Sequence, residues 1–217
     1  MGINIYAIFA LIAGISNTLF GFFVLIKNKK EAFNQLFALL SVGFSIWTIS
    51  YFVWLLQTEV ETALFWSRLL NLGATLIPPF YLHWILIFLN LTKKRRWLIY
   101  FAYFITVVFV VFSFSPVYIK DVEQVREFSF WPQAGPLYTI FLFISYIGFV
   151  GYAFLELIRY YIKTKGETKR QAKYLIIATI IGFGGGATNF PLMYGISLIP
   201  PIGMLETKML IWIVSIG

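Results

Sequence analysis

Long hydrophobic runs, separated by short polar segments, follow one another along the chain. An α-helix rises about 1.5 Å per residue, so about 20 apolar residues are needed to cross a hydrocarbon core of about 30 Å. Six runs meet this requirement, and they are continuous rather than alternating between apolar and polar positions, which disfavours membrane strands. These runs cover residues 4–26, 36–56, 63–91, 97–114, 137–158 and 175–194.

A seventh run, residues 196–217, is weaker because Glu206 and Lys208 interrupt it. The part that follows Lys208 is too short to cross a membrane unaided. The pattern therefore predicts an all-α integral membrane protein, a polytopic bundle of six transmembrane helices plus a seventh that could be truncated. Residues 1–217 form one transmembrane domain in this interpretation.

The longest segment between the predicted helices is residues 115–136. Polar and apolar side chains alternate within it at residues 126–130, which favours a short strand or hairpin over the outer end of the bundle. Such a hairpin could act as a lid. Alternatively, its aromatic side chains could simply anchor the loop at the level of the lipid headgroups.

Composition strengthens the membrane interpretation. Hydrophobic residues make up 60% of the chain and charged residues 12%, whereas roughly a quarter of the residues in soluble domains carry a charge. The net charge of +8 comes from clusters between the apolar runs, so a nucleic-acid-binding face is not predicted. The absence of cysteine excludes disulfides and thiol nucleophiles.

Lysine and arginine concentrate in the loops that follow the first, third and fifth runs. Short cytoplasmic loops hold an excess of these residues, so we expect a multi-pass protein whose N-terminus lies outside the cell. The same loops could also bind anionic lipid headgroups, and the two interpretations are compatible. The cations in question are Lys27, Lys29, Lys30, Lys93, Lys94, Arg95, Arg96, Arg159, Lys163, Lys165, Lys169, Arg170 and Lys173.

The third run contains two adjacent prolines near its middle, Pro78 and Pro79. Each removes a backbone donor and clashes with the preceding turn, so the pattern predicts a kink or local unwinding. We interpret the pair as a hinge.

Polar side chains at membrane depth are costly and often mark a cavity. Arg68, Asn71 and His83 stand out in the third run, although Arg68 could reach the headgroups, Asn71 could bond to another helix and His83 could be a packing residue. Because His83 is the only histidine, a metal site is not predicted. We predict a ligand cavity lined by Arg68, Asn71, Asn189 and Trp131.

Two other groups of residues are interpreted as packing. Trp47, Tyr51 and Trp54 in the second run are expected in the core or at the membrane interface. The glycines at 182 and 184–186 should let helices approach closely. No strand precedes these glycines, so they are not a nucleotide-binding motif.

Several short motifs have the order and spacing of a known family. They are Phe65-Trp66-Ser67-Arg68-Leu69, Gly135-Pro136-Leu137-Tyr138, Gln171-Ala172-Lys173-Tyr174 and the stretch from Gly182 through Asn189 to Pro191. On these residues the chain, from about Asn34 to Gly203, resembles the seven-helix membrane region at the N-terminus of bacterial sensor histidine kinases.

The resemblance implies a non-enzymatic sensory input module in the bacterial cytoplasmic membrane, without a cofactor. Its partners would be the lipid bilayer, a small-molecule or membrane stimulus, a cytoplasmic kinase or other signalling domain, and a second copy in a homodimer. The sequence contains no phosphoacceptor-histidine helix or ATP-binding domain, so we expect a truncated or stand-alone receptor region.

Two other functions compete with sensing. A small transporter or channel could use the broken third helix and its polar face as a pathway, although charges for ion coupling are scarce at depth. A membrane enzyme would need an acid–base or nucleophilic set of residues, and the chain offers only isolated polar ones.

Overall fold

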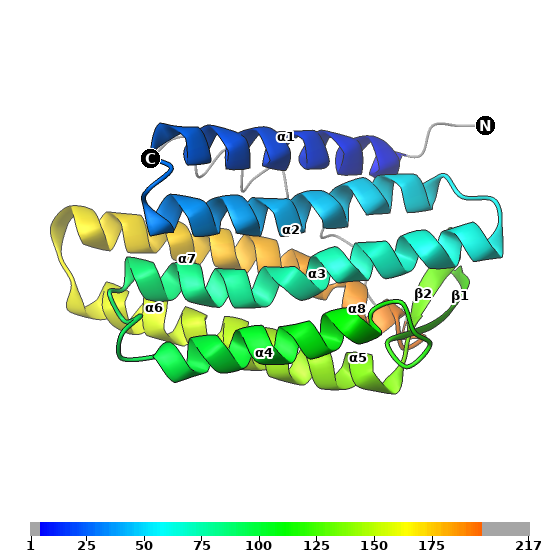
Figure 1. Cartoon of the computed structure of the whole chain (residues 1–217). Coiled ribbons are helices and arrows are strands. Elements are labelled where there is room, and N and C mark those ends of the chain that lie inside the picture. Colours follow the sequence, from blue (N-terminus) through cyan, green and yellow to red (C-terminus); the bar gives the residue numbers. More distant parts are fainter. Residues whose placement is uncertain (1–4, 197–217) are drawn as a thin grey trace.

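The computed structural model describes residues 5–196, which form a bundle of long helices with a β-hairpin at one end (Figure 1). The predicted seventh run, apart from its first residue, lies outside the described residues. The elements are α1 (Ile5–Lys27), α2 (Ala32–Leu55), α3 (Val60–Phe88), α4 (Arg96–Phe112), β1 (Ile119–Val125), β2 (Phe128–Ala134), α5 (Pro136–Phe141), the π-helical segment η1 (Leu142–Val150), α6 (Gly151–Lys163), α7 (Gly166–Ala187) and α8 (Asn189–Leu192).

Five of these helical stretches are long and apolar enough to cross a membrane: α1, α2, α3, the continuous helix Pro136–Lys163 formed by α5, η1 and α6, and Gly166–Leu192. The sixth, α4, is equally apolar but has 17 residues. All six predicted runs therefore lie on helices, and the membrane-spanning length is met in five of them.

Large hydrophobic side chains cover the outward faces of the bundle. Phe22 on α1 is 63% exposed, and Phe104 and Val111 on α4 are 67% and 70% exposed. In water such a surface would be costly, but lipid tails solvate it without penalty. The exposed faces therefore support a membrane location.

Helix α3 is the centre of the bundle, in contact with α2, α4, α6, η1 and both strands. It continues without a break through Pro78 and Pro79, so the local unwinding favoured by the sequence is not seen in this conformation. Because proline has no N–H, the carbonyl groups of Ala74 and Thr75 nevertheless lack their helical donors. The helix is intact here but has fewer backbone hydrogen bonds.

Helices α2 and α3 approach each other closely where two glycines, Gly43 and Gly73, face each other. A Cβ atom added at Gly73 would lie 2.5 Å from the Trp47 backbone nitrogen and 2.9 Å from the Gly43 carbonyl oxygen. By contrast, a Cβ added at Gly184 or Gly186 would meet no atom within 4 Å in the described part of the chain. Close approach therefore occurs at Gly43 and Gly73, and not at these two members of the cluster in α7.

The segment between α4 and α5 forms an antiparallel hairpin of β1 and β2. The side chains of Val122, Phe128 and Trp131 are buried against the bundle, while charged residues such as Glu123 remain exposed. Burial does not alternate strictly along either strand, because the strand pairing is irregular between Ile119 and Asp121 and between Glu123 and Val125.

Candidate functional site

A cavity of about 60 Å³ lies at the hairpin end of the bundle. Its walls come from α2, α3, β2, the start of the helix Pro136–Lys163, and the end of α7 with α8. Half of the residues that line it are aromatic, including Trp47, Tyr51 and Trp54 from one face of α2 and Phe183 from α7. The cavity is therefore built from segments that are far apart in the sequence.

Three of the four residues predicted to bind a ligand line this cavity: Asn71, Trp131 and Asn189. The structure brings them together from α3, β2 and α8. Arg68 is not among the lining residues. Its Nη2 atom instead donates a hydrogen bond to the Ile119 carbonyl oxygen at 3.1 Å, which ties α3 to β1.

Three polar atoms on lining residues have no hydrogen-bond partner within residues 5–196. They are the Tyr51 hydroxyl, Trp131 Nε1 and Asn189 Oδ1. Leaving a buried polar atom unpaired costs about 1–3 kcal/mol, so such atoms are usually satisfied by ordered water or a bound molecule. Their presence around one cavity makes it a candidate binding site.

Tyr51 is the member of this group that sequence analysis assigned to packing. Its ring lies 5.0 Å from the ring of Trp54 and is 3% exposed, as a packing residue would be. Trp47, Tyr51 and Trp54 recur at spacings of four and three, so the pattern placed them on one helical face. Only its hydroxyl, which has no hydrogen-bond partner in the described part of the chain, distinguishes Tyr51 from an ordinary core aromatic.

The hairpin is fastened to the bundle by hydrogen bonds on both sides of the cavity. Trp54 Nε1 donates to the Phe130 carbonyl oxygen at 2.9 Å, and the Ala134 backbone N–H donates to the Met193 carbonyl oxygen at 3.0 Å. The hairpin therefore connects α2 with the segment after α8.

Tyr118, just before β1, anchors the hairpin to α3. The Thr75 hydroxyl donates to the Asn71 carbonyl oxygen at 2.7 Å, so the Tyr118 hydroxyl donates to Thr75 Oγ1 at 2.5 Å. Burial raises the pKa of the Tyr118 phenol well above its usual value, and the group stays protonated as this bond requires.

His83 lies away from the cavity. Its Nδ1 atom is 2.9 Å from the Tyr103 hydroxyl, so it links α3 to α4. Among the described residues no group of His, Cys, Asp or Glu side chains could hold a metal ion. These contacts support the interpretation of His83 as a packing residue.

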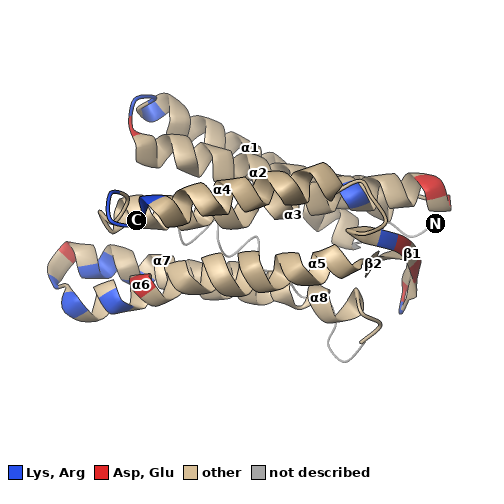
Figure 2. Cartoon of the chain, turned by 60° about the horizontal axis from the view of Figure 1, so that its bottom comes forward, with Lys and Arg blue, Asp and Glu red and all other residues tan. Residues whose placement is uncertain are grey.

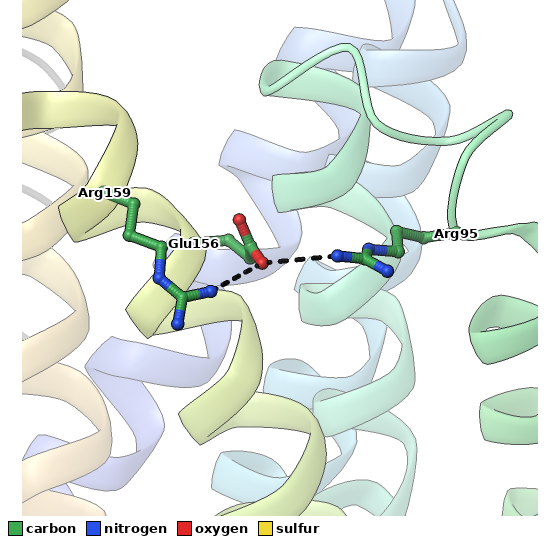
Figure 3. Close-up of polar contacts among 3 residues, drawn as sticks. All are labelled: Arg95, Glu156 and Arg159. Carbon is green, nitrogen blue, oxygen red and sulfur yellow. Dashed lines mark hydrogen bonds and ion pairs between the residues drawn. The ribbon is translucent and has the colours of Figure 1, made fainter. Parts of the chain in front are cut away.

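A second polar cluster lies at the opposite end of the bundle. The carboxylate of Glu156 on α6 is 3.0 Å from Arg159 Nη1 and 3.8 Å from Arg95 Nη2, between the two guanidinium groups (Figure 3). The Arg95 guanidinium also lies 5.7 Å from the centre of the Tyr152 ring. The sequence gives no sign that Arg95 lies near Glu156, whereas in the structure this cluster joins α6 to the start of α4.

One comparison with known proteins gives a match. A family model described as the N-terminal 7TM region of histidine kinase matches residues 8–216. No curated protein and no solved structure matches the chain. The match covers nearly the whole chain and confirms the family resemblance carried by the short motifs.

Proposed function

Because the chain belongs to the family of N-terminal 7TM regions of histidine kinases, we propose that it is the receptor module of a bacterial signalling system. The matched family region is a sensory membrane region and not a catalytic kinase domain. In our proposal the module responds to a stimulus in the cavity and acts on a cytoplasmic histidine kinase or other output partner. The observation that supports this most directly is the set of three unpaired polar atoms around one cavity.

We further propose that α7 is the element that moves. It buries three residues in the bundle, whereas α3 buries fifteen. Its contact with α3 includes the hydrogen bond between the Tyr81 and Thr179 hydroxyls at 2.7 Å. A stimulus that binds one packing of α7 better than another shifts the population toward that packing, by no more than the difference in binding free energy.

Pro78 and Pro79 would be the deformable point in this scheme. They precede Tyr81 by less than one helical turn, and the missing backbone bonds make α3 easier to bend there. Bending at this point would shift Tyr81, and with it the hydrogen bond to α7.

A kinase fusion tests the proposed function. We expect Asn189→Leu and Trp131→Phe, in the full chain fused to a histidine kinase catalytic region, each to change basal autophosphorylation in membrane vesicles by about 5-fold or more. The matched control is Trp97→Phe, because Trp97 is 73% exposed on α4 and does not line the cavity. Unchanged phosphorylation in both cavity variants, at equal protein levels, would refute a sensory role of this cavity.

We propose that the N-terminus and the hairpin lie outside the cell. Figure 2 shows most of the Lys and Arg in the three loops at one end of the bundle, with fewer acidic residues among them, whereas the hairpin end carries both signs of charge without an excess of cations. The excess of cations is the feature that retains loops in the cytoplasm.

The orientation can be checked with alkaline phosphatase, an enzyme active only outside the cytoplasm. We expect a fusion after Gln124, in the hairpin, to be active and a fusion after Arg96, in a basic loop, to be inactive. The reverse pattern would show that the topology is inverted.

A further inference from the structure

The charge of the cavity restricts what it can bind. Among the described residues that line it, none is Lys, Arg, His, Asp or Glu. Burying an ionised group without a partner costs several kcal/mol or more. An anionic or cationic molecule would therefore find no charged partner in the cavity to offset the cost of its burial, so an uncharged molecule is favoured.

The three unpaired atoms specify the polar groups of the ligand. Trp131 Nε1 can only donate a hydrogen bond, and Asn189 Oδ1 can only accept one. The Tyr51 hydroxyl can do either. A molecule that satisfies all three must carry at least one acceptor and at least one N–H or O–H donor.

The volume and the aromatic lining of the cavity further limit which molecules can bind there. A water-sized group needs about 10–15 Å³ by this measure of volume, so about 60 Å³ holds four to six such groups. The Trp54 and Trp131 rings contact each other edge-on at 5.5 Å, and the Tyr146 and Phe190 rings do so at 4.8 Å, so the carbon skeleton of a ligand would meet apolar ring surfaces.

From these observations we propose that the cavity binds a small, uncharged molecule of the carboxamide or urea class. The carbonyl oxygen accepts from Trp131 Nε1 and the Tyr51 hydroxyl, and the amide N–H donates to Asn189 Oδ1. This inference names the ligand of the sensory site and so rests on the proposed function. The bound molecule would occupy the junction between the hairpin and α8, which contribute Trp131 and Asn189.

Three molecules of equal size test this class: acetamide, acetate and acetone. Acetamide offers an acceptor and a donor, acetone only an acceptor, and acetate carries a charge. Binding to the purified full chain in lipid nanodiscs is measured by saturation-transfer NMR. We expect saturable binding of acetamide, and binding of acetone and acetate that is about tenfold weaker or more, since one lost hydrogen bond to a buried site costs about a factor of ten.

Substitutions of cavity residues test whether acetamide binds in the cavity. Tyr51→Phe keeps the ring and removes only the hydroxyl, whereas Trp131→Phe replaces the indole with a smaller phenyl ring and so removes the N–H donor. We expect each variant to weaken acetamide binding about tenfold. Trp97→Phe, on the exposed face of α4, should leave it unchanged. Two variants are used so that the test remains possible if one of them fails to fold. The thermal unfolding midpoint of each variant shows whether it is folded.

Three results would overturn the ligand class: no saturable acetamide binding up to about 100 mM, equal binding of acetate, or undiminished binding in both variants. The acetamide binding test and the kinase-fusion test can fail independently of each other. If the kinase fusion responds to Asn189→Leu and Trp131→Phe while acetamide does not bind, the sensory cavity stands and its ligand belongs to another class. If acetamide binds but the fusion does not respond, the cavity binds amides without signalling.

Discussion

Replacing Gly73 with alanine is expected to lower the free energy of unfolding by about 3 kcal/mol, at the upper end of overpacking costs. The added Cβ would lie 2.5 Å from the Trp47 nitrogen and 2.9 Å from the Gly43 carbonyl oxygen. Both atoms belong to the backbone, so no side-chain rotation relieves the clash and α2 must move away from α3. The measurement is reversible unfolding of the purified protein in mixed micelles, with an increasing fraction of denaturing detergent.

Gly151→Ala is the matched control for Gly73→Ala. Gly151 also lies inside a long helix, and the nearest atom to a Cβ there is the Tyr146 carbonyl oxygen at 3.9 Å, an ordinary contact. Both substitutions gain the same helix propensity, up to about 1 kcal/mol. The difference between the two variants therefore isolates the packing of α2 on α3. Equal unfolding free energies would show that the helices are not so close at Gly73.

Replacing Tyr118 with alanine is expected to cost about 4 kcal/mol, as for other large buried aromatics. The side chain has no exposed surface, and its ring packs against Tyr138 and Phe141 with centroids 5.2 and 5.6 Å away. The substitution also removes the hydrogen bond to Thr75. Because Tyr118 precedes β1 directly, we expect the hairpin to open more often.

Limited trypsin digestion of the purified protein measures that opening at Lys120, which is exposed in β1. Local unfolding exposes the backbone to proteases, so Tyr118→Ala should be cut faster. Tyr118→Phe keeps the ring and should lose only about 1 kcal/mol. The control is Tyr100→Ala, since Tyr100 is 60% exposed on α4. Cleavage of Tyr118→Ala at the rate of the control would mean that Tyr118 does not hold the hairpin.

Much of the fold could be predicted from the sequence because helix formation in a membrane depends on local properties. A run of about 20 apolar residues must satisfy its backbone hydrogen bonds internally, which only a helix does within one segment. Each of the six runs accordingly lies on a helix, with ends that differ by one to nine residues, the largest difference being at the start of α7. The helix α4 is the weakest case, because its apolar helical stretch ends at Phe112.

The candidate site was only partly predictable. Asn71 and Asn189 stand out in the sequence because polar groups are uncommon at membrane depth, and Trp131 stands out among the aromatic residues of the long outer loop. All three line the cavity. Arg68 also stands out as a polar group at membrane depth, yet it donates its hydrogen bond to the backbone of the hairpin and does not line the cavity. Residue type shows that a polar group needs a partner, but not which partner it has.

The helical segments, their lipid-compatible outer faces and the clusters of cations can all be read from the sequence alone, because each depends on neighbouring residues. The sequence does not reveal that Gly43 faces Gly73, that Arg95 reaches Glu156, or that Tyr51 shares a cavity with Trp131 and Asn189. These pairs are set by how helices pack, and the packing depends on the fit of whole surfaces. No local pattern encodes that fit.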